Sequence, residues 1–100
     1  MKTIILLCAQ GMSTGMLMRK MQAESERIGY NCTIKAMPVS QAKMAAKEAD
    51  CLFLGPQVRY ELSQVKVECP DVPVEVIDMI AYGRLDGAAV LKSARKLMND

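Results

Sequence analysis

Short, mostly apolar runs alternate along the chain with longer stretches in which apolar residues recur at helical spacing. The runs predict strands because they are short, rich in branched side chains and bounded by polar or turn-forming residues. We expect these strands at residues 3–7, 32–37, 51–54 and 74–77. The stretches between them predict helices at residues 14–28, 41–48, 57–67 and 88–98. The chain therefore alternates strand and helix four times.

Turn-forming and capping residues mark the ends of these elements. Gly29 follows the first helix, where a glycine commonly ends the helical run. Ser40 can cap the second helix, and Asp86 can cap the last one. Residues 82–87 carry two glycines and are predicted to form a loop. We expect one domain over residues 1–100, since a chain of this length supports a single core.

The alternation predicts an α/β fold with a four-stranded parallel sheet and helices on both faces. Right-handed crossovers leave few topologies, and we expect a flavodoxin-like sheet of order 2-1-3-4. In such a sheet the functional crevice lies beyond the carboxyl ends of the strands, where the winding reverses. That point lies between the first and third strands. Cys8 follows the first strand, Gly55-Pro56-Gln57 the third, and Asp78 the fourth.

Composition and charge exclude several functions. The net charge is +2 and the basic residues are scattered, which argues against bulk nucleic-acid binding. No apolar stretch approaches the roughly 20 residues that span a bilayer, and the N-terminus does not resemble a signal peptide. We therefore expect a cytoplasmic protein that does not insert into a membrane and is monomeric when free. The chain has no histidine, so the usual general base and the commonest metal ligand are missing.

The chain contains four cysteines but no Cys-x-x-Cys pair. A thioredoxin-like redox site and a four-cysteine zinc site are therefore not indicated, and we expect no metal and no disulfide bond. Cys32, Cys51 and Cys69 are interpreted as structural residues that pack as small apolar side chains. Cys8 differs because a loop of small polar residues follows it and leads into a helix.

This loop has the residue types of an anion-binding site around a sulfur nucleophile. N–H groups of the first helical turn lack partners within the helix, and the positive end of a helix favours thiolate and bound anions. Cys8 is the candidate nucleophile. The candidate phosphoryl-binding residues are Ala9, Gln10, Gly11, Met12, Ser13, Thr14 and Gly15. The alternative is that Cys8 is a buried cysteine at a strand end and the loop is only a turn.

Two known families share a cysteine loop between a strand and a helix. The chain resembles the low-molecular-weight tyrosine phosphatases, whose loop has cysteine, five residues, arginine, and then serine or threonine. Here Thr14 occupies the arginine position, and the next arginine is Arg19. Because that arginine stabilises the transferring phosphoryl group, its absence predicts slow hydrolysis. A cysteine-dependent phosphatase is kept as the alternative function.

The chain more closely resembles the enzyme IIB component of the sugar phosphotransferase system, of the lactose/cellobiose (chitobiose) class. Four ordered motifs over most of the chain support this resemblance. They are Leu7-Cys8-Ala9-Gln10-Gly11-Met12-Ser13-Thr14, Leu54-Gly55-Pro56-Gln57, Pro73-Val74-Glu75-Val76-Ile77-Asp78, and Tyr82-Gly83 with Asp86-Gly87.

The resemblance implies a phosphotransferase that needs no cofactor. Cys8 would accept a phosphoryl group from a histidine of enzyme IIA, forming phosphocysteine. It would then pass the group to a sugar, such as cellobiose, chitobiose or lactose, that the membrane component IIC holds. The protein would thus reach the inner face of the membrane through IIC. Nothing in a phosphoryl-binding loop reads a sugar, so the sequence does not identify the substrate.

Three further residues are possible neighbours of Cys8, namely Gln57, Asp78 and Tyr82. Asp78 is interpreted as a hydrogen-bond acceptor that braces a loop, in preference to a catalytic acid. A third hypothesis is a binding module without catalysis, for example for flavin. Four aromatic residues in the whole chain disfavour it, since flavin rings usually stack on aromatic side chains.

Overall fold

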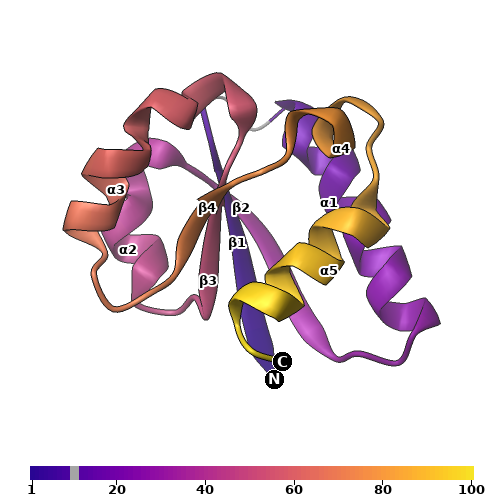
Figure 1. Cartoon of the computed structure of the whole chain (residues 1–100). Coiled ribbons are helices and arrows are strands. Elements are labelled where there is room, and N and C mark those ends of the chain that lie inside the picture. The colour runs from indigo at the N-terminus through magenta and orange to yellow at the C-terminus, as the bar shows by residue number, and fades with distance from the viewer. Residues whose placement is uncertain (10–11) are drawn as a thin grey trace.

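The chain folds around one parallel sheet (Figure 1). The structure, a computed structural model, describes residues 1–9 and 12–100. The strands are β1 (Lys2–Cys8), β2 (Cys32–Pro38), β3 (Cys51–Leu54) and β4 (Val74–Val76). They lie in the order β2-β1-β3-β4, and every neighbouring pair is parallel. The predicted topology is therefore confirmed.

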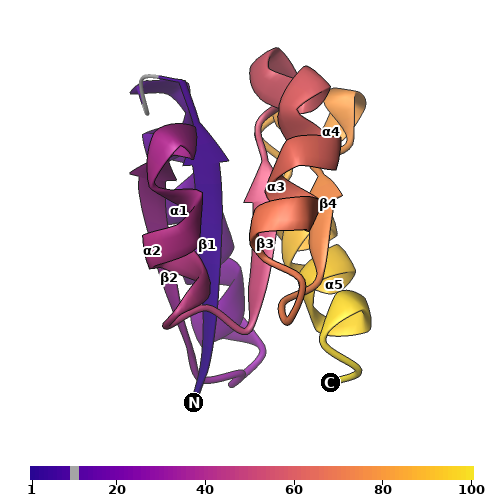
Figure 2. The ribbon, with the colours of Figure 1, turned by 90° about the vertical axis from the view of Figure 1, so that its left-hand side faces the viewer.

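Helices cover both faces of the sheet. The α-helices are α1 (Met12–Arg27), α2 (Ala42–Ala46), α3 (Leu62–Glu68), α4 (Met79–Gly83) and α5 (Gly87–Leu97), and the 3₁₀ helices are η1 (Val39–Gln41) and η2 (Pro56–Glu61). Helices α1 and α5 lie on one face, and α2 and α3 lie on the other (Figure 1). Figure 2 shows α2 and α3 in front of the strands. The result is a three-layer α/β domain.

The two central strands, β1 and β3, contribute side chains to both hydrophobic cores. Their side chains alternate between the faces, as the pleat of a strand requires. Ile4, Leu6 and Phe53 pack toward α1 and α5, whereas Ile5 and Leu7 pack toward α2 and α3. Each of these five side chains is at most 1% exposed. Burial of one such side chain contributes about 1.5–3 kcal/mol, so these strands anchor both helical layers.

The third predicted helix is wrong as a single element. Instead of one helix over residues 57–67, the chain forms η2 and then α3, with non-helical angles at Val58 (φ −116°, ψ 23°). Pro56 lies at the start of η2, and Gly55 before it is extended. Val58 and Val65 still face the core, each 2% exposed. The apolar spacing therefore predicted burial correctly and missed the kink.

The loop predicted at residues 82–87 is also partly wrong, because α4 ends at Gly83. This helix is one turn long, too short to leave a periodic pattern. Its first turn is capped by Asp78, whose Oδ2 accepts the Ala81 N–H at 3.0 Å. Asp86 accepts the Ala89 N–H at 3.1 Å, so its predicted capping of α5 is confirmed.

Ser40 does not cap the second helix. It lies inside η1, and α2 begins after Gln41, whose side chain makes no capping hydrogen bond. Helix α2 is correspondingly shorter than the predicted residues 41–48. Gly29 follows α1 with φ 71°, which confirms its predicted role at the helix end.

Both chain termini lie at the edge of the sheet opposite the carboxyl ends of the strands (Figure 1). The C-terminus is held there by contacts with the segment that follows α1. The Tyr30 hydroxyl donates a hydrogen bond to the Asp100 carboxylate. The Arg95 guanidinium stacks 4.4 Å from the Tyr30 ring centroid and donates to the Asp100 carbonyl oxygen at 3.2 Å. These contacts hold the C-terminal residue against the segment that follows α1.

Gly87 allows α5 to approach α1 closely. A Cβ at this position would lie 2.4 Å from the Lys20 carbonyl carbon and 2.5 Å from the Met21 nitrogen. We expect Gly87→Ala to lower the free energy of unfolding by about 1–3 kcal/mol, because the helix backbones must separate. Urea unfolding followed by circular dichroism measures this.

Gly83→Ala is the matched control for this test. A Cβ at Gly83 meets nothing within 4 Å. This variant should keep its stability or gain up to about 1 kcal/mol. Equal stability of the Gly87→Ala variant and the wild-type chain would contradict the close approach of α5 to α1.

Candidate functional site

Cys8 is the last residue of β1, at the point where the sheet's winding reverses. Its strand lies between β2 and β3, and Cys8 itself is in register with Pro38. On the other side, β3 ends at Leu54, and the Gly55 N–H donates to the Leu7 carbonyl oxygen at 2.9 Å. The connections after β1 and β3 lead to opposite faces of the sheet. Cys8 thus lies where parallel α/β sheets usually bind ligands.

The Cys8 sulfur is almost buried, and among the described residues groups from two different elements hydrogen-bond to it. The side chain is 6% exposed. The Thr14 hydroxyl donates a hydrogen bond to Cys8 Sγ at 3.4 Å. The Cys8 thiol in turn donates to the Met37 carbonyl oxygen at 3.9 Å. Thr14 is fully buried in the first turn of α1. A buried hydroxyl therefore donates to the sulfur at the positive end of a 16-residue helix.

The predicted loop is shorter than expected because α1 begins at Met12 and not at residue 14. Met12, Ser13, Thr14 and Gly15 belong to the first helical turn. Ala9 is an exposed residue outside the strand. Gln10 and Gly11 lie outside the described residues. The helical start brings N–H groups without intrahelical partners close to Cys8 in sequence, which favours anion binding there.

Gln57 and Tyr82 lie together, and Gln57 is close to Gly55, which borders Cys8. The Gln57 Nε2 donates to the Tyr82 hydroxyl at 3.4 Å. A Cβ built on Gly55 would lie 3.1 Å from Gln57 Oε1 and 4.0 Å from Cys8 Cβ. Gln57 comes from η2 and Tyr82 from α4, so the ends of β3 and β4 each supply one side chain. The structure therefore brings these two candidates together, and Gly55 lies between Gln57 and Cys8.

Asp78 also lies at the carboxyl ends of the strands, where it caps a helix. Its carboxylate caps α4 through the Ala81 N–H. It therefore acts as the bracing acceptor that the sequence predicted. By fixing the first turn of α4, it positions Tyr82, whose N–H donates to the Asp78 carbonyl oxygen at 2.9 Å.

Sequence reasoning placed Gly55 near Cys8 but missed the Met37 carbonyl. The contact with Met37 follows from the strand order, since β2 flanks β1 and its carboxyl end borders Cys8. The signal was therefore available in the predicted topology. It was not visible in any side chain, because a backbone group makes this contact.

Cys32, Cys51 and Cys69 are free thiols, as predicted. Burial raises the pKa of Cys32 and of Cys69. Burial, followed by the charges of Asp50 and Glu75, raises the pKa of Cys51 to about 12. At neutral pH these three thiols stay protonated and are poor nucleophiles. Cys8 is the cysteine that the fold brings to the functional edge.

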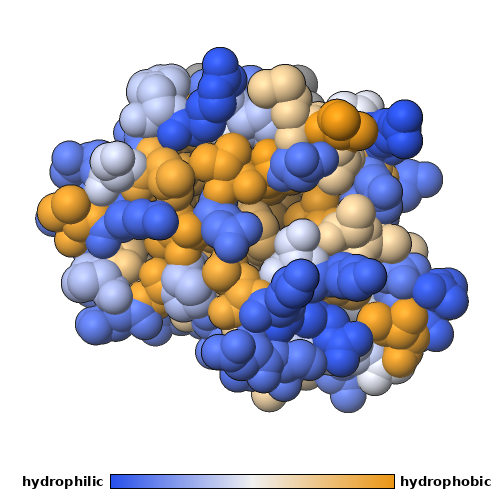
Figure 3. Space-filling model, viewed as in Figure 1, coloured by the Kyte–Doolittle hydropathy of each residue, from blue (hydrophilic) through white to orange (hydrophobic). Residues whose placement is uncertain are grey.

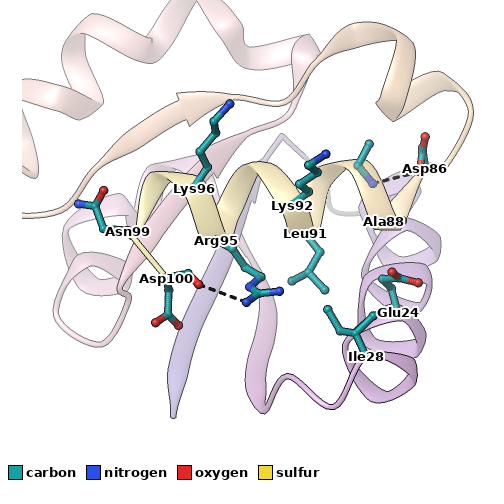
Figure 4. Close-up of a pocket in the computed structure, with 11 residues that line it drawn as sticks. Glu24, Ile28, Asp86, Ala88, Leu91, Lys92, Arg95, Lys96, Asn99 and Asp100 are labelled. Atoms are coloured by element: carbon teal, nitrogen blue, oxygen red, sulfur yellow. Dashed lines mark hydrogen bonds between the residues drawn. The ribbon is translucent and has the colours of Figure 1, made fainter.

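One large hollow among the described residues does not include Cys8. It has a volume of about 740 Å³ and lies between α1 and α5 (Figure 4). Ile28 and Leu91 form its apolar floor, and Glu24 and Lys92 lie at its sides. Its charged residues have both signs, and none of Gln57, Asp78 and Tyr82 lines it. We therefore place the candidate site at the carboxyl ends of the strands, around Cys8.

Among residues 1–9 and 12–100, no group of three or more cysteine, aspartate or glutamate side chains could hold a metal ion. Within the same residues, no helix has the length and apolar character to cross a bilayer.

Comparison with known families and sequences gives a consistent result. The family described as "PTS system, Lactose/Cellobiose specific IIB subunit", where PTS is the phosphotransferase system, matches residues 3–93. The oligo-beta-mannoside-specific EIIB component of Bacillus subtilis is 39% identical and covers 98% of this chain and 97% of the relative. The galactose-specific EIIB component of Lactococcus lactis subsp. cremoris and the cellobiose-specific one of Lactococcus lactis subsp. lactis have the same identity and coverage.

Solved structures agree with this comparison. A cellobiose-specific phosphotransferase IIB component from Borrelia burgdorferi superposes with a TM-score of 0.83 and 30% identity, covering 98% of this chain and 92% of that one. A lactose-specific IIB domain from Streptococcus pneumoniae has a TM-score of 0.81 at 15% identity and covers 95% of each chain, which supports the fold.

The raised pKa of Cys51 predicts a loss of stability at high pH. Below the ordinary value of 9.0 the thiol is protonated in both states, so the full stability is present. Between 9 and about 12 only the unfolded chain ionises, and stability falls by up to about 1.4 kcal/mol per pH unit. Urea unfolding from pH 8 to 11 measures this slope.

Cys51→Ala removes the ionising group and serves as the control. Its slope above pH 9 should be shallower than that of the wild-type chain by up to about 1.4 kcal/mol per pH unit. Parallel slopes in the two proteins would show that the buried thiol does not cause the loss.

Proposed function

The chain belongs to the lactose/cellobiose-specific IIB family of the phosphotransferase system, and from this membership we propose that Cys8 is its phosphoryl carrier. Members of this family are phosphotransferases that carry a phosphoryl group toward a sugar. The observation that best supports Cys8 is the hydrogen bond from the buried Thr14 hydroxyl to the Cys8 sulfur at 3.4 Å.

The proposed reaction consists of two displacements at phosphorus. In the first, the Cys8 thiolate attacks a phosphohistidine of enzyme IIA; the P–N bond breaks and a P–S bond forms. In the second, a sugar hydroxyl held by IIC attacks, the P–S bond breaks, and the thiolate leaves. The sulfur is negative before the first step and after the second. A hydroxyl that donates to sulfur stabilises these states, because hydrogen bonds to charged groups are the stronger ones.

The residues around Cys8 are proposed to hold the phosphoryl group. A phosphoryl group on sulfur carries roughly two negative charges, by analogy with phosphoserine. N–H groups of residues 10–15, with the Ser13 and Thr14 hydroxyls, would bind its oxygens at the start of α1. Ala9 to Gly15 would thus enclose it without a cationic side chain. Gln57 and Tyr82 form one wall, and Asp78 fixes the helix that carries Tyr82.

Transfer is favoured over hydrolysis by the same residues. Thr14 stands where the phosphatase loop has its arginine, and its hydroxyl hydrogen-bonds to the sulfur. The charge stabilisation that an arginine gives to a transferring phosphoryl group is therefore missing at this position. The phosphatase alternative is not favoured by the relatives either, which are IIB components.

The proposed partners are enzyme IIA as donor and the membrane component IIC as acceptor. The chain has no histidine, so the donor histidine must come from another protein. The protein would act in the cytoplasm and reach the membrane through IIC. The three sequence relatives are equally similar to this chain and are named for three different sugars. We therefore propose that the sugar is selected elsewhere, within the class of β-linked disaccharides and related sugars.

Phosphoryl transfer to Cys8 can be tested by mass spectrometry. The full chain is incubated with phosphoenolpyruvate, the general phosphotransferase proteins and a IIA protein from a relative. We expect one added phosphoryl group, located on Cys8, and its loss in Cys8→Ser. Cys69→Ser is the matched control, because a hydroxyl can keep the hydrogen bond from this side chain to the Ala42 carbonyl.

Two outcomes would contradict this proposal. One is a phosphoryl group on another cysteine, or an acid-stable label in the Cys8→Ser variant. The other is sustained turnover of p-nitrophenyl phosphate by the wild-type chain, which would indicate a phosphatase.

Thr14→Val tests the hydrogen bond to sulfur. Valine keeps the shape of threonine and removes the hydroxyl. We expect phosphoryl transfer to slow by about tenfold to a hundredfold, the effect of losing one hydrogen bond to a charged group. Alkylation of Cys8 by iodoacetamide at neutral pH should slow as well. Thr14→Ser should retain most of both rates, and equally slow Ser and Val variants would mean that threonine acts through packing alone.

A further inference from the structure

The outer edge of β4 has hydrogen-bonding groups without a strand beside them. β4 is the last strand of the sheet, next to β3 only. The Leu52 N–H donates to the Pro73 carbonyl oxygen, and the Ile77 N–H donates to the Leu54 carbonyl oxygen, both at 2.9 Å. Because successive residues of a strand alternate, Pro73, Glu75 and Ile77 direct their backbone groups toward β3. Val74 and Val76 direct theirs outward.

The side chains of β4 also alternate between the two faces. Val74 and Val76 pack in the core that faces α2 and α3. Glu75 is in register with Phe53, which lies in the core that faces α1 and α5. Glu75 is exposed, and it takes part in neither ion pair found among the described residues. The edge therefore presents a carboxylate on one face and valines on the other.

Two hollows border this strand, and Glu75 lines both. The one toward α5 has a volume of about 490 Å³ and is lined by apolar side chains such as Phe53 and Val90, with Ser93. The one toward α3 has a volume of about 360 Å³ and includes Pro70, Val72 and Lys66, with Leu97 from the end of α5. Figure 3 views this edge and shows apolar surface gathered over the middle of the face, between α3 and α5.

The charges differ between the two sides. The charged residues that line the hollow toward α5 are Glu75 and Asp78, both acidic. The hollow toward α3 has Lys66 and, at its border with the first, Glu75. A basic side chain is therefore favoured on the α5 side of the edge. On the α3 side the lysine disfavours a second cation, and apolar side chains fit better.

A second copy of the chain fits this edge poorly. In the two-fold register that pairs both valines with valines, Val74 lies opposite Val76 of the other copy. Glu75 would then lie directly opposite its own symmetry mate. Like charges at opposed positions of neighbouring strands are destabilising. The edge thus favours a different chain over itself.

We propose that the outer edge of β4 binds an extended segment of a partner protein as a fifth, antiparallel strand. The segment has an apolar–basic–apolar pattern. Its basic residue lies opposite Glu75 on the α5 side, and its two apolar residues lie opposite Val74 and Val76 on the α3 side. Main-chain hydrogen bonds to Val74 and Val76 hold the segment, and the alternating side chains select it.

Hydrogen exchange on the full, ¹⁵N-labelled chain tests this proposal. The probe is the peptide acetyl-Ser-Thr-Val-Lys-Val-Thr-Ser-amide, titrated to millimolar concentration. We expect its binding to slow exchange of the Val74 and Val76 amides. The Glu75 and Ile77 amides face β3 and should change little. Protection of Val74 and Val76 distinguishes strand addition from binding on a helical surface.

Exchanging the charges tests the selectivity. With glutamate in place of the peptide's lysine, binding to the wild-type chain should weaken by about two- to fivefold, as for a cross-strand charge pair. Glu75→Lys should reverse this preference between the two peptides. Because Glu75 is an exposed side chain on an edge strand, this variant should fold as the wild-type chain does, which its circular dichroism spectrum checks.

Three results would overturn the proposal. The first is the absence of protection at Val74 and Val76 at millimolar peptide. The second is a peptide preference that Glu75→Lys leaves unchanged. The third is concentration-dependent dimerisation of the wild-type chain by sedimentation velocity, with protection of these amides in the dimer, since this edge would then bind its own copy.

Discussion

The parallel pairing of β1 with β3 is the constraint on which the rest of the structure depends. The partners Ile4–Cys51 through Leu7–Leu54 are buried on both faces, so their backbone groups must bond to each other. This register fixes where both strands end. It sets Gly55 against Leu7 and leaves Cys8 at the edge. The helices then pack on the two faces of β1 and β3, whose relative position this register has already determined.

The same constraint explains why one cysteine of four is suited to chemistry. Cys51 begins β3 in the middle of the core, fully buried, and its thiol is held protonated. Cys8 ends β1 and meets the start of α1, where Thr14 supplies a hydroxyl. Both are cysteines in central strands of one sheet. Their difference comes from the position along the strand, because the carboxyl end of β1 opens onto a helix N-terminus and the amino end of β3 is enclosed by the core.

The sequence predicted the sheet order and the thiol's location because both depend on long-range patterns. Buried strands such as β1 and β3 are continuous apolar runs, and their alternation with helices leaves few topologies. The single-turn helix α4 and the kink at Val58 leave no such pattern, since each depends on one local hydrogen bond or dihedral angle. The contact of Cys8 with the Met37 carbonyl could not be predicted from side-chain types, because a backbone group makes it.

Both termini lie at the edge of the sheet that faces away from Cys8 (Figure 1). A tether attached at either end would leave the Cys8 sulfur unobstructed. Fusion to another protein would raise the local concentration of that protein around this domain. The end of the sheet that carries Cys8 would remain accessible to other partners. The packing of Arg95 and Asp100 around Tyr30 means that a C-terminal tether starts from a fixed point. The fold can therefore be part of a longer polypeptide without any change in the surroundings of Cys8.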